Sequence, residues 1–158
     1  MLLILRKRFY LVITVLLIVL SDQLSKLVIV NNIETLINKN FLFFSINYVE
    51  NYGAAFNFFN DNRLFLSFIS LLSSLIFSYL IFFVKNIRIS DRYGLSFILG
   101  GSIGNGIDRI INGFVVDFIN INFISFPVFN IADISINIGF LILVITIFKG
   151  DNNKWLLF

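Results

Sequence analysis

The stretch LFLSFISLLSSLIFSYLIFFV, residues 64–84, decides the fold class because it contains no charged residue. A transmembrane helix needs about 20 predominantly apolar residues to cross the hydrocarbon core of a bilayer. Three further stretches have a similar length, and each carries ionisable residues toward one end: 9–30, 93–111 and 128–148. The sequence therefore predicts an all-α integral membrane protein with four transmembrane helices.

Composition supports this fold class and limits the possible chemistry. Of 158 residues, 58% are hydrophobic and 13% are charged, whereas soluble domains are about 45–50% apolar and about 25% charged. The chain has neither Cys nor His. This excludes a disulfide framework, a thiol nucleophile, a Cys- or His-ligated metal and a Ser-His-Asp triad. We expect no cofactor and no metal, so any catalysis must use carboxylates, amides, hydroxyls, Lys or Arg.

Basic residues indicate the orientation in the membrane. They precede the first span, separate the second span from the third, and follow the fourth: Arg6, Lys7, Arg8, Lys85, Arg88, Arg92, Lys149 and Lys154. The only basic residues in the connections 31–63 and 112–127 are Lys39 and Arg63. By the positive-inside rule, both termini lie in the cytoplasm and these two connections face outward. The basic residues form no stripe, so nucleic-acid binding is not expected despite the net charge of +3.

The N-terminus could instead be a cleavable signal peptide, with a basic start and an apolar stretch over 9–20. However, SDQLSK follows at 21–26 in place of a small-residue cleavage site, and apolar residues then resume to Val30. We therefore expect a retained first span. No internal repeat and no soluble region stand out, so residues 1–158 are expected to form a single membrane domain.

The outward-facing connections contain two strand-like segments. Residues 45–51 favour a strand, and Ile119-Asn120-Ile121-Asn122-Phe123 alternates apolar and polar side chains with a period of two. Beside a membrane, such strands can rest an apolar face on lipid or on the ends of the helices.

Four of the nine acidic residues lie in or beside the spans, toward their predicted outer ends: Asp22, Asp108, Asp117 and Asp133. A charge inside a bilayer costs about 2.5–3.5 kcal/mol even on lenient insertion scales. Taken singly, each acid could simply meet water at the end of a span. Because they converge at one level with amide side chains beside them, a shared functional site is favoured.

Two of these acids have a basic neighbour in the sequence. Asp22 and Lys26 are four residues apart and therefore share a helical face. Asp108 directly precedes Arg109 and, with Asn105, forms a polar edge at the end of the third span. Carboxylates that are paired with cations suit structural support better than proton transfer.

Asp117 and Asp133 have no cation nearby in the sequence. If the fold brings them together, like-charge repulsion leaves one carboxyl group protonated and the other ionised, which supplies a general acid and a general base. Such a dyad can activate water for peptide hydrolysis. Asn130 can face Asp133 at the start of a helix, which Pro127 helps to place. The spacing alone also permits two unrelated aspartates at the edges of loops.

Five motifs occur in order along the chain: DQLSK at 22–26, NYGAAF at 51–56, GGSIGNGIDR at 100–109, VVDF at 115–118 and FNIAD at 129–133. Together with the length and the four-span layout, these motifs resemble those of the bacterial lipoprotein signal peptidases, also called signal peptidase II. The resemblance covers nearly the whole chain.

The resemblance implies an aspartyl endopeptidase of the bacterial cytoplasmic membrane. Such an enzyme removes the signal peptide from a prolipoprotein, cutting just before a cysteine that bears a diacylglyceryl group. It implies that Asp117 and Asp133 are the catalytic dyad, and that seven polar residues support the site or contact substrate: Asp22, Lys26, Asn51, Asn105, Asp108, Arg109 and Asn130. It further implies a small extracytoplasmic β-cradle at about 40–60 and a mobile segment that covers a site open toward the outer face. We expect a monomer whose partners are this substrate and membrane lipid.

Two other classes of function remain open on the residues alone. A proton- or ion-coupled membrane carrier also uses intramembrane aspartates. The second and fourth spans, however, are nearly free of charge on their cytoplasmic halves, which leaves no relay to the inner side. A membrane scaffold is the other class, and it would tolerate conservative Asp→Asn changes.

Overall fold

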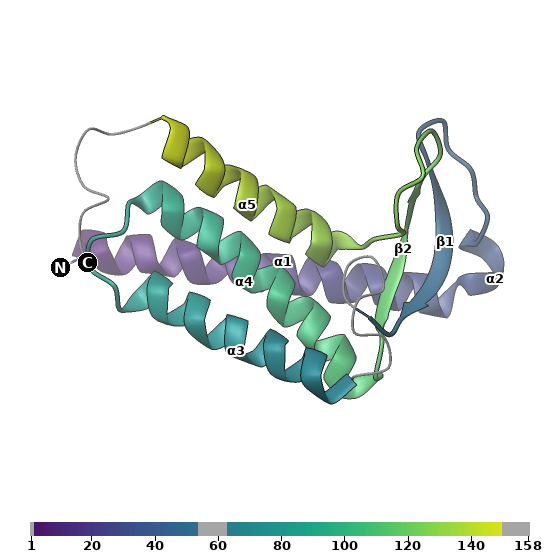
Figure 1. Cartoon of the computed structure of the whole chain (residues 1–158), viewed down its shortest axis with the longest axis horizontal. Coiled ribbons are helices and arrows are strands. Elements are labelled where there is room, and N and C mark those ends of the chain that lie inside the picture. Colours follow the sequence, from purple (N-terminus) through teal and green to yellow (C-terminus); the bar gives the residue numbers. More distant parts are fainter. Residues whose placement is uncertain (1, 54–62, 150–158) are drawn as a thin grey trace.

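The structure is a computed structural model that describes residues 2–53 and 63–149. In chain order its elements are α1 (Leu2–Asn31), α2 (Ile33–Leu36), β1 (Phe44–Asn51), α3 (Arg63–Phe82), α4 (Ile89–Ile111), β2 (Val115–Ile121) and α5 (Ile131–Phe148). The long helices α1, α3, α4 and α5 run side by side, and the sheet lies across one end of them (Figure 1).

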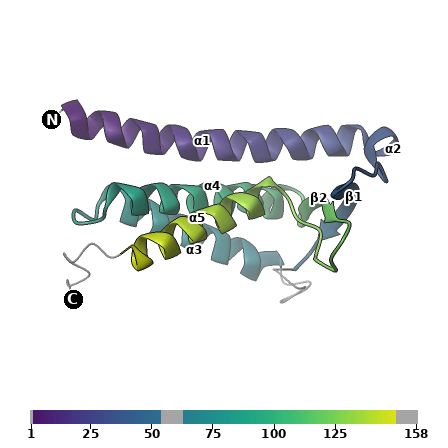
Figure 2. The same cartoon turned by 90° about the horizontal axis from the view of Figure 1, so that it is seen from above.

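The central helix is α4, which packs against α1, α3 and α5. Seen from above, α1 forms one layer, and α3, α4 and α5 lie together in the other (Figure 2). One buried apolar cluster joins α1, α3 and α4: Leu11, Val15, Ile81, Leu95 and Leu99. A second cluster, formed by Ile29, Val116 and Phe118, fixes the sheet on the end of α1.

Three helices in the described ranges are long and apolar enough to cross a membrane: Arg8–Asn31, Leu64–Phe82 and Ile131–Phe148. They confirm the predicted first, second and fourth spans by length and composition. The predicted third span corresponds to α4, which is long enough at 23 residues but is not among the three. Its buried face carries polar residues such as Asp91, Asn105 and Asp108. Because α1, α3 and α5 pack around α4, these polar residues contact protein.

Close contacts between the helices depend on glycines. A Cβ atom on Gly139 of α5 would lie 2.5 Å from the carbonyl oxygen of Gly94 on α4. A Cβ atom on Gly104 of α4 would lie 2.6 Å from Asp22 Oδ2 of α1. Any larger residue at Gly104 would therefore displace a carboxylate, so this glycine brings α1 and α4 together at the level of the polar residues.

The sheet joins two segments that lie far apart in the sequence. β1 and β2 pair antiparallel, with Asn51 opposite Val115 and Val49 opposite Asp117, and the register shifts between Ile46 and Val49. The predicted strand at 45–51 is confirmed by β1. Of the predicted segment 119–123, residues 119–121 lie in β2, which begins earlier, at Val115, and ends at Ile121. The predicted cradle range of about 40–60 contains β1, which pairs with β2 from the second connection, and residues 54–60 of that range lie outside the described residues.

The last helix begins later than predicted, at Ile131 and not at Val128. Pro127 precedes a short extended stretch in which Phe129 forms an antiparallel bridge with Ile119 of β2. The side chain of Asn130 then caps α5. The chain therefore completes its contact with the sheet before it turns into the helix, and this turn places Asp133 under β2.

Candidate active site

The nine predicted site residues lie together where the C-terminal ends of α1 and α4 and the start of α5 meet the sheet. Six of them are buried: Asp22, Lys26, Asn105, Asp108, Asp117 and Asn130. The other three, Asn51, Arg109 and Asp133, are half-buried. The predicted convergence of the four aspartates on one level is therefore confirmed.

Lys26 forms ion pairs with two of the aspartates. Its Nζ atom lies 2.8 Å from Asp22 Oδ2 and 2.8 Å from Asp108 Oδ2. The predicted pairing of Asp22 with Lys26 is confirmed, and Lys26 also forms an ion pair with Asp108, which the sequence spacing did not predict. Adjacent residues on a helix point about 100° apart, so Arg109 faces elsewhere and donates hydrogen bonds to the Gly53 carbonyl at 3.1 Å and to Ser70 Oγ at 3.4 Å.

Asp22 and Asp108 also accept hydrogen bonds from backbone N–H groups of α5 and β2. These are the two elements that carry Asp133 and Asp117. Asp22 Oδ1 accepts a hydrogen bond from the Ala132 N–H in the first turn of α5, at 2.9 Å. Asp108 Oδ2 accepts from the Val116 N–H of β2, at 3.2 Å. A carboxylate at a helix N-terminus satisfies a free N–H group and interacts favourably with the helix dipole. We call Asp22, Lys26 and Asp108 the ion cluster, and its contacts show a structural role.

Gln23 belongs to this support, although the sequence analysis did not single it out. Its Nε2 atom donates to Asp22 Oδ2 at 3.2 Å, to the Gly104 carbonyl at 3.1 Å and to Asp108 Oδ1 at 3.0 Å. The only signal in the sequence was its position inside the DQLSK motif. A glutamine near the end of a span can equally face water, so this signal was too weak.

Asp133 is held by the start of its own helix. Its backbone N–H donates to Asn130 Oδ1 at 3.0 Å, while its Oδ2 accepts from the Asn130 N–H at 3.1 Å. This reciprocal pair is a capping box, and it confirms the prediction that Asn130 faces Asp133. Asn105 Nδ2 donates to the remaining oxygen, Oδ1, at 2.8 Å.

Asp117 is also held by amide side chains. Asn130 Nδ2 donates to its Oδ1 at 2.6 Å, and Asn51 Nδ2 of the neighbouring strand donates to its Oδ2 at 2.9 Å. Asn130 therefore contacts both Asp117 and Asp133. The network continues to the ion cluster, because Asn105 Oδ1 accepts from Asn130 Nδ2 at 3.1 Å and from Lys26 Nζ at 3.0 Å.

Burial sets the protonation behaviour of Asp117. Its side chain is 2% exposed, and the loss of solvation raises its pKa from 3.8 to about 7, with a further contribution from the negative charge of Asp133. The hydrogen bonds from Asn51 and Asn130 and the charge of Lys26 oppose this rise in pKa. At neutral pH, Asp117 can therefore either hold or release a proton.

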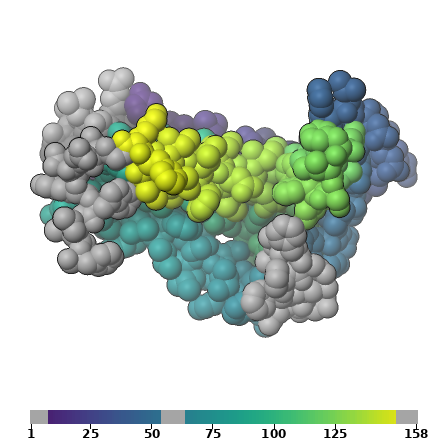
Figure 3. Space-filling view, turned by 45° about the horizontal axis from the view of Figure 1, so that its top comes forward, coloured from purple at the N-terminus to yellow at the C-terminus, as the bar shows by residue number. Residues whose placement is uncertain are grey.

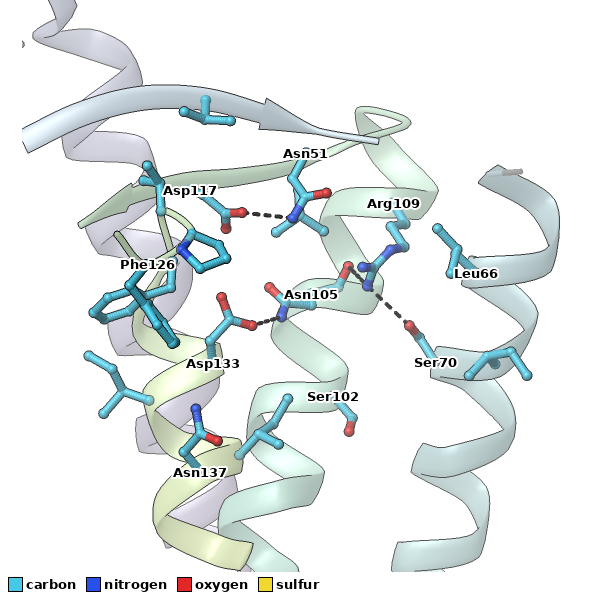
Figure 4. Close-up of a pocket in the computed structure, with 18 of the residues that line it drawn as sticks. Asn51, Leu66, Ser70, Ser102, Asn105, Arg109, Asp117, Phe126, Asp133 and Asn137 are labelled. Carbon is cyan, nitrogen blue, oxygen red and sulfur yellow. Dashed lines mark hydrogen bonds between the residues drawn. The ribbon is translucent and has the colours of Figure 1, made fainter. Parts of the chain in front are cut away.

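Asp117 and Asp133 line a pocket of about 970 Å³ bounded by α3, α4, α5 and the sheet. Their carboxyl groups face the same space, with Arg109 and Asn51 beside it (Figure 4). The surface is hollowed between α5 and α3 (Figure 3). Much of the wall is apolar, including Leu66, Ile138 and Leu141. The arrangement can bind an apolar chain and present one of its bonds to two carboxyl groups.

The described residues contain no group of three acidic side chains placed to hold a metal ion. The expected absence of a metal and of a cofactor stays a prediction. The chemistry that these residues can supply by themselves is proton transfer by the carboxyl groups and hydrogen bonding by the amides.

The chain is similar to known proteins over most of its length. Residues 14–149 match the protein family described as Signal peptidase (SPase) II. The lipoprotein signal peptidase of Gloeothece citriformis is 41% identical over 136 residues, which cover 84% of this chain and 85% of that protein. The lipoprotein signal peptidase of Streptococcus agalactiae serotype Ia is 38% identical over 152 residues, which cover 94% of this chain and 97% of that protein. A solved bacterial membrane enzyme matches with a TM-score of 0.80 at 29% identity, over 94% of each chain.

Proposed function

The chain belongs to the signal peptidase II family, and we propose that it removes the signal peptide from prolipoproteins, cutting just before a cysteine that bears a diacylglyceryl group. The lipoprotein signal peptidases that it resembles support the reaction, and the mainly apolar pocket suits a lipid-bearing substrate. The similarities do not support the alternative of a proton- or ion-coupled carrier.

Asp117 and Asp133 form the catalytic dyad in this proposal. The observation that carries it is their shared pocket, in which each carboxyl group is held by amides and the pKa of Asp117 is about 7. One carboxylate takes a proton from water while the water oxygen attacks the scissile carbonyl carbon. The other, protonated carboxyl group gives its proton to the carbonyl oxygen.

The tetrahedral intermediate then collapses with the roles reversed. The first carboxyl group gives its new proton to the leaving nitrogen as the C–N bond breaks. The second takes the proton of a hydroxyl group as the carbonyl re-forms, which restores the starting state. The remaining polar residues act around this dyad: Asp22, Lys26 and Asp108 fix the elements, Asn51, Asn105 and Asn130 orient the carboxyl groups, and Arg109 lies beside the pocket.

The proposal places four spans in the bacterial cytoplasmic membrane, with α4 as the span that the other three shield. Positive charges at the ends of the helices that lie away from the sheet support cytoplasmic termini. The dyad lies at the opposite end, beside the sheet, and therefore opens toward the outer face. The chain acts as a monomer in contact with membrane lipid, without nucleic acid. Part of the range of about 40–60 that was expected to hold the covering segment lies outside the described residues.

The test is an electrophoretic shift assay in which the purified chain is incubated with a lipidated prolipoprotein and with its unlipidated precursor. We expect cleavage of the lipidated form alone, and this activity should survive a chelator. Asp117→Asn and Asp133→Asn should each lower the rate at least about a thousandfold while membrane insertion and thermal stability are retained. If the wild type leaves the lipidated substrate intact, the proposed function is wrong. If either variant cleaves at close to the wild-type rate, the dyad is wrong.

A further inference from the structure

The pocket continues beyond the dyad, between α3 and α5, and there it carries polar side chains on otherwise apolar helices. Ser70 and Ser73 come from α3, Ser102 from α4 and Asn137 from α5, and all four line the pocket. Figure 4 shows Ser102 and Asn137 on neighbouring helices below Asp133. We call these four residues the polar strip. The chemistry proposed for the dyad does not use it.

Two members of the polar strip have no hydrogen-bond partner among the described residues. Ser73 Oγ donates to the Ser70 carbonyl at 3.0 Å, and Ser70 Oγ accepts from Arg109. Over residues 2–53 and 63–149, by contrast, no hydrogen bond involves the Ser102 hydroxyl or the Asn137 amide.

Other hydroxyl groups in these helices are satisfied by the helix itself. Ser96 Oγ donates to the Arg92 carbonyl at 2.8 Å, and Ser135 Oγ donates to the Ile131 carbonyl at 2.9 Å. This bond to the carbonyl four residues earlier is the usual arrangement for a serine inside a helix. The Ser102 hydroxyl, which has the same option, is left available to the pocket.

The position of Asn137 makes its unpaired amide costly. Asn137 is the seventh residue of α5, so it lies about 9 Å along the helix from its start. In a spanning helix this depth is inside the hydrocarbon region, where lipid offers no hydrogen bond. A polar group without a partner there is unfavourable, and such residues are functional candidates.

The backbone of the substrate also lacks hydrogen-bond partners inside the membrane. A peptide bond can reach two carboxyl groups only if the chain around it is extended, and an extended chain in a membrane has unpaired N–H and C=O groups. An asparagine amide offers one donor group and one acceptor, which match one backbone N–H and one C=O group. In the described part of the chain, the sheet lies across the end of the helices and supplies no edge at this depth to do the same.

We propose that Asn137, with Ser102, hydrogen-bonds the main chain of the signal peptide just before the scissile bond and so sets which bond lies against the dyad. The proposal rests on the proposed function. Asn137 lies four residues, or about 6 Å, from Asp133 along α5. An extended substrate advances about 3.3 Å per residue. The contact therefore falls on the second or third residue before the cut.

The experiment combines enzyme variants with backbone-modified substrates. Asn137→Leu removes the amide at similar volume, Asn137→Gln retains an amide, and Asn120→Leu is the matched control, because Asn120 lies in β2 and bonds Ser45 Oγ outside the pocket. The lipidated substrates carry an ester in place of the amide bond at the second, third or sixth residue before the cut. The ester removes the N–H donor and weakens the C=O acceptor.

We expect Asn137→Leu to lower kcat/KM about tenfold on the all-amide substrate, as the loss of one ordinary hydrogen bond implies, and Asn137→Gln to recover part of this loss. An ester at the second or third position should slow the wild type and Asn120→Leu to a similar extent, but should add nothing to the Asn137→Leu defect. An ester at the sixth position should affect all enzymes equally. The thermal midpoint of Asn137→Leu should not fall, because no residue in the described ranges makes a hydrogen bond to this amide.

Two results would overturn this inference while leaving the proposed function intact. One is an Asn137→Leu enzyme with wild-type kcat/KM, and the other is an ester penalty of the same size in Asn137→Leu and in the wild type. A marked loss of thermal stability in Asn137→Leu would also overturn it, since the amide would then serve the fold. Failure of the wild type itself to cleave the lipidated substrate would instead count against the proposed function.

Discussion

The two pairs of aspartates in this site lie in the same polar layer but have different partners. Asp22 and Asp108 share the ammonium group of Lys26, with both N–O distances at 2.8 Å. Asp117 and Asp133 instead receive hydrogen bonds from the amides of asparagines. An amide orients a carboxyl group without supplying a full positive charge, so the second pair can exchange protons.

This difference gives the two pairs of aspartates different roles, structural support and acid–base chemistry. A buried carboxylate that is paired with a cation is fixed in its charge and can hold a backbone in place. A buried carboxyl group held by neutral donors has a pKa that burial can raise toward neutral pH, as at Asp117. The structure thus places an ion-paired support beside a pair of carboxyl groups that can act as acid and base.

The largest predicted effect is on the ion cluster. Lys26→Met leaves two buried carboxylates without their cation, which should destabilise the folded protein by about 3–5 kcal/mol. Thermal denaturation in detergent measures this change. Lys39→Met, at an exposed position, is the matched control and should unfold close to the wild-type temperature. Equal stability of the two variants would show that the ion cluster does not hold the fold.

The next effect concerns the amides around the dyad. Asn51→Leu removes a hydrogen bond that lowers the pKa of Asp117, so this pKa should rise. A dyad that needs one proton loses activity as the pH rises through that pKa. The alkaline limb of kcat/KM, near pH 7 in the wild type, should therefore move to higher pH, and the maximal rate should fall about tenfold. The alkaline limb of Asn120→Leu should stay at the wild-type pH. A shift of this limb to lower pH in Asn51→Leu would contradict the proposed role of Asn51.

The smallest effect on activity is expected at Gln23, whose side chain contacts the ion cluster and the Gly104 carbonyl. Gln23→Leu removes donors to Asp22 and Asp108 and should lower stability by about 1–3 kcal/mol. The activity of each folded molecule and the alkaline limb of its pH profile should not change. A shift of this alkaline limb would mean that proton binding by the ion cluster and by the dyad is coupled. The two pairs of aspartates would then not have separate roles.

The sequence was most informative where the relevant residues are neighbours. The three-residue spacing of Asn130 and Asp133 predicts their contact, and the four-residue spacing of Asp22 and Lys26 predicts their ion pair; the structure confirms both. The uncharged stretch at 64–84 likewise predicts a helix that is long and apolar enough to cross a membrane.

Contacts between distant segments could not be derived from spacing. Asn51 and Asp117 are 66 residues apart, and their contact depends on the register of a sheet formed by two separate connections. Lys26 reaches Asp108 only because Gly104 lets α1 approach α4. Sequence proximity instead suggested Arg109, whose direction on the helix is set by the 100° step between neighbours. Composition could not establish α4 as a span, because its polar residues face protein.

The central claim is that Asp117 holds a proton that it exchanges near neutral pH. Infrared spectroscopy of the purified protein measures this directly, through the carbonyl stretch of protonated carboxyl groups as a function of pH. We expect one such signal that disappears with a midpoint near pH 7, is present in the wild type and in Gln23→Leu, and is absent in Asp117→Asn. A wild-type protein with no carboxyl group titrating between about pH 6 and pH 8, or an Asp117→Asn variant that keeps the signal, would contradict it.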